Sequence, residues 1–393
     1  MRRESQGTVM AKKNLGIIGY DSFHYIVENI ERAHTFYVDK LDFKLVARSS
    51  AALTQESGQE SRVYSAGNVR VCVTAPVRQD SRAARYLRRH PSGIMNMTYR
   101  VQDLDFAQKV LEERHATLLD DPVEFEDGKG GRYRYFDIAT PLGDVFFRFI
   151  ERTDFKDFAP GFEDVEDDGK PSNRFGFMEI DHATSNFLTM HPMIAWLRDV
   201  LGMKQFWDVE FHTQDVQGKR DEGSGLKSIV MWDEESGVKF ANNEPLRPHF
   251  DQSQITKFVY DNMGPGVQHI ALTVPEIIPT IDELKKRGID FLHTPGAYYR
   301  AMPDRLKEIK ITNLKEDPKE LERLEILVDG GNDRYMLQIF LRDFASYYDD
   351  ERAGPFFYEI IQRAGDEGFG YGNFRALFES IEREQKAVTK AAD

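Results

Sequence analysis

Short segments of alternating apolar and polar residues occur along the chain, and they recur in the same order. Residues 19–48 have the pattern of a strand, an amphipathic helix and a second strand, and residues 177–206 repeat it. Laid over each other without gaps, the two stretches match Asp21 with Asp181, among other identities. Self-similarity of this kind predicts that one structural unit is present twice.

Two further pairs of segments extend the repeat. Residues 93–97 align with residues 266–270, and each segment precedes a predicted helix. The apolar run at 146–152 aligns with residues 357–363. Two tandem copies of one βαβ-type module therefore account for the length of 393 residues.

The composition between the copies predicts a linker. Residues 153–172 are acidic and contain glycine and proline, so we expect an N-terminal module at 14–152 and a C-terminal module at 173–393. The second copy is longer, chiefly because charged helical segments are inserted at 293–325. A glycine-rich turn at 365–372 precedes a terminal helix, which either packs as ordinary core or acts as a lid.

One carboxylate interrupts the strand-like apolar run of residues 356–361. Burial of an unpaired carboxylate is costly, so Glu359 must be paired, protonated or bound to a metal if this strand is buried. The alternatives are an edge strand with Glu359 in water and an ion pair with Arg363. In a strand, Glu359 shares one face with the apolar residues Phe357 and Ile361.

Three potential metal ligands lie on different predicted strands of the second copy: His182, His269 and Glu359. Two histidines and one carboxylate form the facial triad that holds Fe(II) and leaves three positions open. A lone histidine in a strand is more often a core residue than a ligand. The three residues stand at equivalent ends of the strands of one module, however, so we predict an Fe(II) site at these positions.

The first copy has different chemistry at the equivalent positions. It carries Ser22, Asn96 and Arg148, and the arginine would repel a cation. We therefore expect the first module to be free of metal and to serve a structural or oligomerising role.

Composition restricts the class of protein further. A net charge of -14 argues against nucleic-acid binding. Cys72 is the only cysteine, which excludes an internal disulfide and a cysteine-based zinc site and suits a reducing cytoplasm. No run approaches 18 apolar residues, and the N-terminus lacks the apolar core of a signal peptide, so we expect neither membrane span nor secretion signal.

The second half also contains a dense set of short motifs. They occupy residues 181–182, 225–230, 243–245, 253–255, 264–272, 337–340, 359–363 and 368–374. This set resembles the 4-hydroxyphenylpyruvate dioxygenase family of the vicinal oxygen chelate superfamily, and the resemblance covers residues 14–387. It implies an α+β fold of two tandem glyoxalase-like modules built from repeated βαβββ units. The C-terminal module is then an open β-barrel closed by the C-terminal helix.

The resemblance implies a specific reaction. The family binds Fe(II) through two histidines and a glutamate, which match His182, His269 and Glu359. It converts 4-hydroxyphenylpyruvate and O2 to homogentisate and CO2 in tyrosine catabolism. The substrate carries its own 2-oxo acid and chelates the iron, so no separate 2-oxoglutarate is required.

The resemblance also assigns a substrate pocket. Positions matching Ser228, Asn243 and Gln254 line or hydrogen-bond the phenol end of the substrate in the family, and those matching Phe340 and Phe374 flank its ring.

Other pocket positions follow from the strand pattern and from the motifs. Gln338 shares a strand face with Phe340, so that face offers an amide and an aromatic wall. Gln268 directly precedes a ligand and is expected to point to the opposite strand face. The remaining matched positions are Phe369, Asn373 and Phe378.

Two departures from the family pattern affect the pocket. Ala241 and Asn242 precede the Asn-Glu-Pro segment where many relatives have Pro-Leu, and Tyr358 stands where a smaller or non-hydroxylated residue is common. The alternative is therefore 4-hydroxymandelate synthase, a relative that uses the same substrate and iron. Asn243 and Phe340 favour the dioxygenase.

Two other classes of function are less consistent with the chain. A glyoxalase-like isomerase on zinc or nickel uses four protein ligands, and no fourth ligand is found. A non-enzymatic binding protein built from the same modules would leave Glu359 unexplained. We expect a cytoplasmic protein and, by resemblance, a homodimer or homotetramer.

Overall fold

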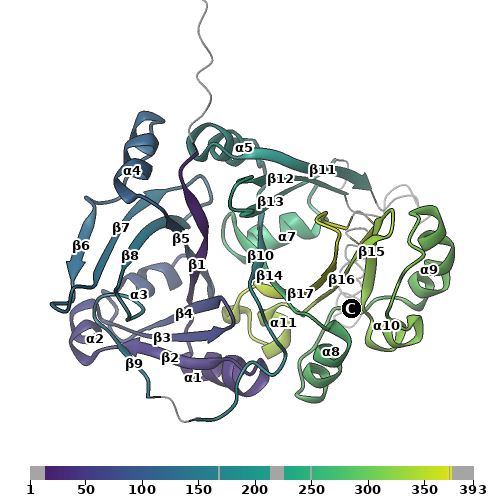
Figure 1. Cartoon of the computed structure of the whole chain (residues 1–393), viewed down its shortest axis with the longest axis horizontal. Coiled ribbons are helices and arrows are strands. Elements are labelled where there is room, and N and C mark those ends of the chain that lie inside the picture. Colours follow the sequence, from purple (N-terminus) through teal and green to yellow (C-terminus); the bar gives the residue numbers. More distant parts are fainter. Residues whose placement is uncertain (1–13, 167–168, 213–224, 248–249, 371, 374–393) are drawn as a thin grey trace, which may run out of the picture.

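Two curled sheets lie beside each other in the computed structural model, one from each half of the chain (Figure 1). The structure describes residues 14–166, 169–212, 225–247, 250–370 and 372–373. No helix in this part of the chain is long and apolar enough to cross a membrane.

The first module contains nine strands and the helices that cover them. The strands are β1 (Ile17–Ile26), β2 (Lys44–Ser49), β3 (Gln59–Ala66), β4 (Val69–Pro76), β5 (Gly93–Val101), β6 (Val123–Glu126), β7 (Arg132–Ala139), β8 (Phe146–Thr153) and β9 (Phe162–Asp164). The helices are α1 (Ile30–His34), which continues as the π-helical turn η1 (Thr35–Lys40), α2 (Ala51–Ser57), α3 (Arg82–Leu87) and α4 (Leu104–Glu113).

The second module repeats this arrangement with additional helices. Its strands are β10 (Ile180–Asn186), β11 (Lys204–His212), β12 (Gly225–Trp232), β13 (Lys239–Pro245), β14 (Gly266–Thr273), β15 (Leu327–Gly331), β16 (Arg334–Phe340) and β17 (Phe357–Ala364). Its helices are α5 (His191–Trp196) with the π-helical turn η2 (Leu197–Leu201), α7 (Gln254–Asp261), α8 (Ile277–Lys286), α9 (Gly296–Glu308), α10 (Pro318–Leu324), α11 (Phe344–Tyr348) and the 3-10 turn η3 (Glu351–Ala353).

The two sheets have the same strand order. The first runs β2-β3-β4-β1-β5-β8-β7-β6, with β9 added beside β2, and the second runs β11-β12-β13-β10-β14-β17-β16-β15. Parallel pairs occur at equivalent places, β1 with β4 and β10 with β13, β5 with β8 and β14 with β17. The predicted α+β fold of two tandem modules is therefore confirmed.

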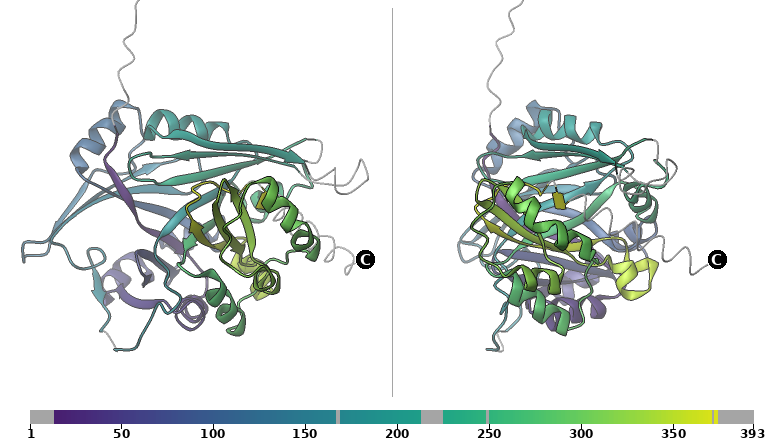
Figure 2. Two further views of the ribbon diagram at one scale, coloured as in Figure 1. Left: turned by 45° about the vertical axis from the view of Figure 1, so that its right-hand side comes forward. Right: turned by 90° about the vertical axis from the view of Figure 1, so that its right-hand side faces the viewer.

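Local sequence signals explain where individual helices begin. Asp103 caps α4 by accepting a hydrogen bond from the backbone N–H of Phe106, and Asp317 caps α10 in front of Pro318. The helices α9 and α10 belong to the predicted insertion. They lie at the end of the molecule farthest from the first module (Figures 1 and 2).

Aromatic side chains join the two modules. The rings of Phe147 and Phe240 lie 5.3 Å apart, and those of Tyr25 and Phe356 lie 5.4 Å apart. Buried apolar residues of both modules belong to one continuous core. This shared core fixes the second module, and with it the strands that carry the candidate ligands, against the first.

Candidate metal centre

The three predicted ligands meet on three neighbouring strands. His182 lies on β10, His269 on β14 and Glu359 on β17, and these strands are adjacent in the second sheet. The Nε2 atoms of His182 and His269 lie 3.3 and 3.4 Å from Oε2 of Glu359. All three side chains are buried, and no other group of three metal-binding side chains occurs in the described part of the chain.

The geometry of this triad fits a metal ion. When two ligand atoms each lie about 2.1 Å from a metal ion and subtend a right angle at it, they are about 3 Å apart. The observed separations of 3.3 and 3.4 Å are close to that value. Two neutral imidazoles and one carboxylate are also the donor set expected for a divalent transition metal. The residues present therefore suit a metal cofactor.

A second layer of side chains sets the tautomer of each histidine. Nδ1 of His182 donates to Oδ1 of Asp181 at 2.8 Å, and Nδ1 of His269 donates to Oε1 of Gln268 at 3.2 Å. Because Nδ1 carries the proton in both rings, Nε2 is unprotonated and directs its lone pair toward Glu359.

Each of these partner residues sits in a β-bulge. Along the β10–β14 pair, Ile180 and His182 oppose Leu272 and Ala271, so Asp181 is an extra residue on β10. Gln268 is likewise extra on β14. The expectation that Gln268 points away from its ligand is wrong, because the bulge breaks the strict alternation of side chains.

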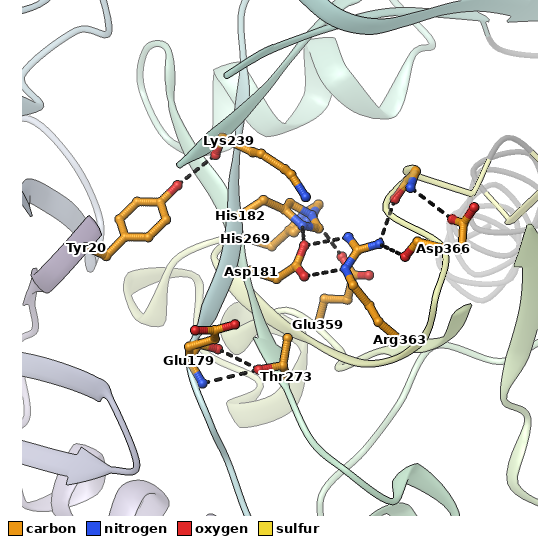
Figure 3. A network of polar contacts seen from close by, with 11 residues as sticks. Tyr20, Glu179, Asp181, His182, Lys239, His269, Thr273, Glu359, Arg363 and Asp366 are labelled. Carbon is orange, nitrogen blue, oxygen red and sulfur yellow. Dashed lines mark hydrogen bonds and ion pairs between the residues drawn. The ribbon is translucent and has the colours of Figure 1, made fainter. Parts of the chain in front are cut away.

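Arg363 holds Asp181 in place (Figure 3). Its guanidinium donates two hydrogen bonds to the Asp181 carboxylate, of 2.5 and 2.7 Å, and two more to the carbonyls of Asp366 and Gly368. Burial raises the pKa of Asp181, but the bonds from Arg363 and His182 outweigh it and hold that pKa far below its usual value. Arg363 thus pairs with Asp181, and the alternative of an ion pair with Glu359 is not observed.

The charges within the triad are balanced in the same way. Burial raises the pKa of Glu359, but the histidines outweigh this effect and the pKa stays below its usual value. Burial lowers the pKa of His269, whereas in His182 the charges and hydrogen bonds of Glu359 and Asp181 together outweigh burial and raise the pKa. Glu359 is therefore an ionised carboxylate, as a metal ligand must be.

In the first module an ion pair occupies the position that corresponds to the triad. Arg148, at the position of Glu359, forms a two-pronged ion pair with Asp137, with distances of 2.7 and 2.8 Å. The bulge at Asp21 and its partner Arg152 repeat Asp181 and Arg363, with the Asp21–Arg152 pair at 3.2 Å. The bulge and its ion pair thus belong to the module, and only the ligands distinguish the second copy.

A small cavity opens beside the triad. Of the predicted pocket residues, Gln338, Phe340 and Phe369 lie on its walls. The Phe369 ring lies 4.7 Å from the ring of His182, and the Phe340 ring lies 5.9 Å from that of His269.

Other predicted pocket residues lie farther along the same barrel and are not on the cavity wall. Ser228 and Asn243 are register partners on β12 and β13, and Asn243 in turn pairs with Asn186 on β10. Gln254 begins α7, which packs on β13 and β10. All four side chains are buried.

These buried side chains leave polar atoms without protein partners. Nδ2 of Asn243 donates to Oδ1 of Asn186 at 3.0 Å, which leaves Oδ1 of Asn243 and Nδ2 of Asn186 unsatisfied. Oγ of Ser228 and Nε2 of Gln254 also lack a partner among the described residues. Buried polar atoms are normally hydrogen-bonded, so an unpaired cluster indicates a place where a polar ligand binds.

The C-terminal part of the predicted pocket is only partly described. Asn373 is fully buried, and its Nδ2 donates to Oε1 of Gln338 at 3.1 Å. Phe374 and Phe378, with most of the predicted lid helix, lie outside the described residues.

Three residues near the site were not predicted from the sequence: Asp181, Asn186 and Thr184. Asp181 contacts His182, Asn186 contacts Asn243, and Thr184 is the strand partner of His269. The gap-free match of Asp21 with Asp181 was the available signal for the first of these residues.

Comparison with known proteins agrees with this architecture. The family model of the Glyoxalase/Bleomycin resistance protein/Dioxygenase superfamily matches residues 19–143 and 179–302. A 4-hydroxymandelate synthase mutant from Streptomyces coelicolor has a similar fold, with a TM-score of 0.77 at 24% identity over 94% of this chain and 99% of that one. Two modules of this kind with a buried His-His-Glu triad define a metal-dependent protein of the glyoxalase and dioxygenase superfamily.

Closer relatives define the family within this superfamily. The 4-hydroxyphenylpyruvate dioxygenase of Dictyostelium discoideum is 32% identical, covering 94% of this chain and 98% of its own length. That of Danio rerio is 34% identical, covering 93% of this chain and 91% of its own length. The chain belongs to the 4-hydroxyphenylpyruvate dioxygenase family.

Proposed function

We propose that this protein is an Fe(II)-dependent dioxygenase that converts 4-hydroxyphenylpyruvate and O2 to homogentisate and CO2. The observation that carries the proposal is the buried triad of His182, His269 and Glu359 beside a cavity with unpaired polar atoms beyond it. Bound by the triad, Fe(II) would supply the redox chemistry that activates O2.

The protein's own residues exclude water and hold the ligands. The triad is buried, and the rings of Phe340 and Phe369 stand over its two histidines. Asp181 and Gln268 keep the protons of the histidines on Nδ1 and so keep each Nε2 free. A dry, preorganised site of this kind protects a reactive oxidant from side reactions.

The polar atoms beyond the cavity fit the phenol end of the substrate. The Asn186–Asn243 pair leaves one donor and one acceptor free, which is the complement of a hydroxyl group. Ser228 and Gln254 add a hydroxyl and a further amide donor. The aromatic ring then occupies the space between this polar cluster and the triad, with Phe340 at its side.

We further propose a cytoplasmic homodimer or homotetramer. The single cysteine, Cys72, is a buried free thiol, which suits a reducing compartment. Size-exclusion chromatography with light scattering measures the mass in solution, and a mass of 45.4 kDa would contradict the oligomer.

Anaerobic reconstitution tests the reaction. Purified protein is loaded with Fe(II), mixed with 4-hydroxyphenylpyruvate and exposed to O2, and the product is identified by mass spectrometry and NMR. Homogentisate is the expected product. Hydroxymandelate would show a different reaction at the same site, and the absence of both turnover and iron uptake would overturn the proposal.

A further inference from the structure

A chain of hydrogen bonds connects the inserted helix α9 to the cavity. Tyr298 on α9 donates its hydroxyl hydrogen to Oδ1 of Asn373 at 2.8 Å. Nδ2 of Asn373 then donates to Oε1 of Gln338 at 3.1 Å, and Gln338 lies on the cavity wall. Figure 1 places α9 beside β15 and β16 at the outer end of the second sheet.

Counting donors fixes the direction of this chain. The Tyr298 oxygen accepts hydrogen bonds from Arg305 and from the backbone N–H of Val328, the latter at 2.8 Å. A hydroxyl has two acceptor positions and one hydrogen, so the hydrogen of Tyr298 must go to an acceptor. Its possible acceptors are Oδ1 of Asn373 and the carbonyl of Val328; that carbonyl already accepts from Arg305, whereas Oδ1 of Asn373 is buried and has no other donor among the described residues.

The orientation of Tyr298 determines the orientation of both amides. When Oδ1 of Asn373 points at Tyr298, the NH2 group of Asn373 faces Gln338 and donates to its Oε1 atom. The NH2 group of Gln338 has no partner among the described residues and remains available at the cavity. Gly370 leaves room for this arrangement, since a Cβ there would lie 2.7 Å from Oε1 of Gln338.

We infer that Tyr298 and Asn373 are positioning residues that hold Gln338 with its amide donor toward the substrate. Without the hydroxyl of Tyr298, neither amide is fixed, and Gln338 presents its oxygen to the cavity for part of the time. An oxygen facing an acceptor oxygen of the 2-oxo acid substrate weakens binding. The inference rests on the proposed function, because it concerns the same substrate.

The inference assigns a role to the insertion that the first module lacks. The ring of Tyr298 is held by Arg305, whose guanidinium carbon lies 4.3 Å from the ring centre. Both residues lie on α9, and both contact Val328 at the edge of the sheet. Helix α9 therefore supplies a fixed hydroxyl at the far end of the amide chain.

A double-mutant cycle in the Fe(II)-loaded enzyme tests the inference. The four proteins are wild type, Tyr298→Phe, Gln338→Ala and the double variant, assayed by O2 consumption with 4-hydroxyphenylpyruvate. Tyr298→Phe is expected to lower kcat/KM roughly tenfold, mainly through KM, with unchanged iron content. In the Gln338→Ala background, Tyr298→Phe is expected to cause no further loss.

The neighbouring residue provides a matched control. Tyr299 on the same helix is also buried, and its hydroxyl donates to the carbonyl of Ile326 at 3.2 Å. This bond lies outside the hydrogen-bond relay formed by Tyr298, Asn373 and Gln338. Tyr299→Phe should keep wild-type kinetic constants. If Tyr298→Phe fails to fold, Asn373→Asp takes its place in the cycle, since a carboxylate accepts from Tyr298 but cannot donate to Gln338.

The possible outcomes separate this inference from the proposed function. If the losses from Tyr298→Phe and Gln338→Ala multiply in an enzyme that makes homogentisate, the relay is overturned and the function stands. If Tyr299→Phe shows the same KM effect, the role of Tyr298 is merely structural. A folded, iron-loaded wild type without turnover overturns the proposed function and the relay with it.

Discussion

Glu359 shows how one residue can indicate a site from its chemistry alone. It is 2 % exposed, lies among apolar strand residues and, within the described part of the chain, is paired with His182 and His269. Arg363, the other possible partner, is occupied by Asp181. A buried carboxylate between two histidines that face it with Nε2 is explained by a metal ion bound between the two nitrogen lone pairs and the carboxylate.

Replacement of Glu359 by alanine should remove metal binding and turnover. Two histidines alone leave too few ligands, so the Fe(II) content of Glu359→Ala should fall at least tenfold and its activity below detection. Metal analysis after anaerobic loading, with circular dichroism to verify the fold, measures this effect. Glu367→Ala, an exposed change in the following turn, is the control. Wild-type activity in Glu359→Ala would disprove the site.

Thr184 shows the opposite case, a residue beside the triad that no pattern in the sequence distinguishes. It is fully buried, follows His182 by two residues and opposes His269 across the strands, yet its hydroxyl has no partner among the described residues. An unpaired buried hydroxyl destabilises the folded state. Such a group is retained where it serves function at the expense of stability.

Thr184→Val should therefore change stability and activity in opposite directions. Loss of the unpaired hydroxyl should raise the free energy of unfolding by about 1 kcal/mol, while kcat/KM should fall severalfold if that hydroxyl is reserved for the substrate. Urea denaturation and steady-state kinetics measure the two quantities. Thr98→Val is the control, since that hydroxyl donates to Asn96 at 2.6 Å and its loss should destabilise. Unchanged kinetics in Thr184→Val would show that its hydroxyl does not contact the substrate.

At the scale of elements, β17 is held from both of its faces. One face carries Glu359 into the triad, and the other carries Tyr358 into the core between the modules. The hydroxyls of Tyr358 and Tyr37 lie 2.6 Å apart and both side chains are almost fully buried. The hydroxyl of Tyr358, noted in the sequence as unusual, thus ties the ligand strand to the first module.

A double substitution tests this tie. Tyr358→Phe should lower the free energy of unfolding by about 1 to 2 kcal/mol, because the hydroxyl of Tyr37 is then buried without a partner. Removing both hydroxyls in Tyr37→Phe/Tyr358→Phe should restore most of the stability, since no unpaired group remains. Chemical denaturation of the three variants measures the effect. Equal destabilisation by the single and double changes would show that the pair does not interact.

The sequence predicted these elements well, and the reason is the internal repeat. It located β10, β14 and β17 and placed one ligand on each, because strand patterns and ligand identities are local properties. The bulge at Gln268 was missed, since period-two alternation assumes an unbroken ladder. The hydrogen-bond partners of Asn186 and Tyr298 are distant in the sequence, so no local pattern could predict these contacts.

At the scale of the whole molecule, charged contacts reinforce the apolar junction of the modules. Asp42 of the first module accepts a hydrogen bond from the backbone N–H of Arg174 at 2.8 Å and pairs with its guanidinium at 2.6 Å. Arg287, which directly follows α8 in the second module, lies 3.7 Å away. Burial raises the pKa of Asp42, but the bonds from Arg174 outweigh it and hold the pKa below its usual value.

This lowered pKa predicts a specific dependence of stability on pH. In the unfolded chain this carboxyl titrates near pH 3.9. The contribution of Asp42 to the free energy of unfolding is therefore complete well above that pH and is lost as the pH falls through the lower pKa of the folded state. Asp42→Asn should lower the free energy of unfolding by about 1 kcal/mol at pH 7, and the difference from wild type should shrink below about pH 4.

Asparagine is the appropriate replacement because it tolerates the φ of 62° at position 42, so backbone strain does not confuse the comparison. Urea denaturation at several pH values measures the difference, with Asp304→Asn, an exposed change in α9, as the control. A difference between Asp42→Asn and wild type that stays constant from pH 7 to pH 3 would show that the carboxylate charge does not hold the modules together. The apolar core of aromatic residues would then account for the junction alone.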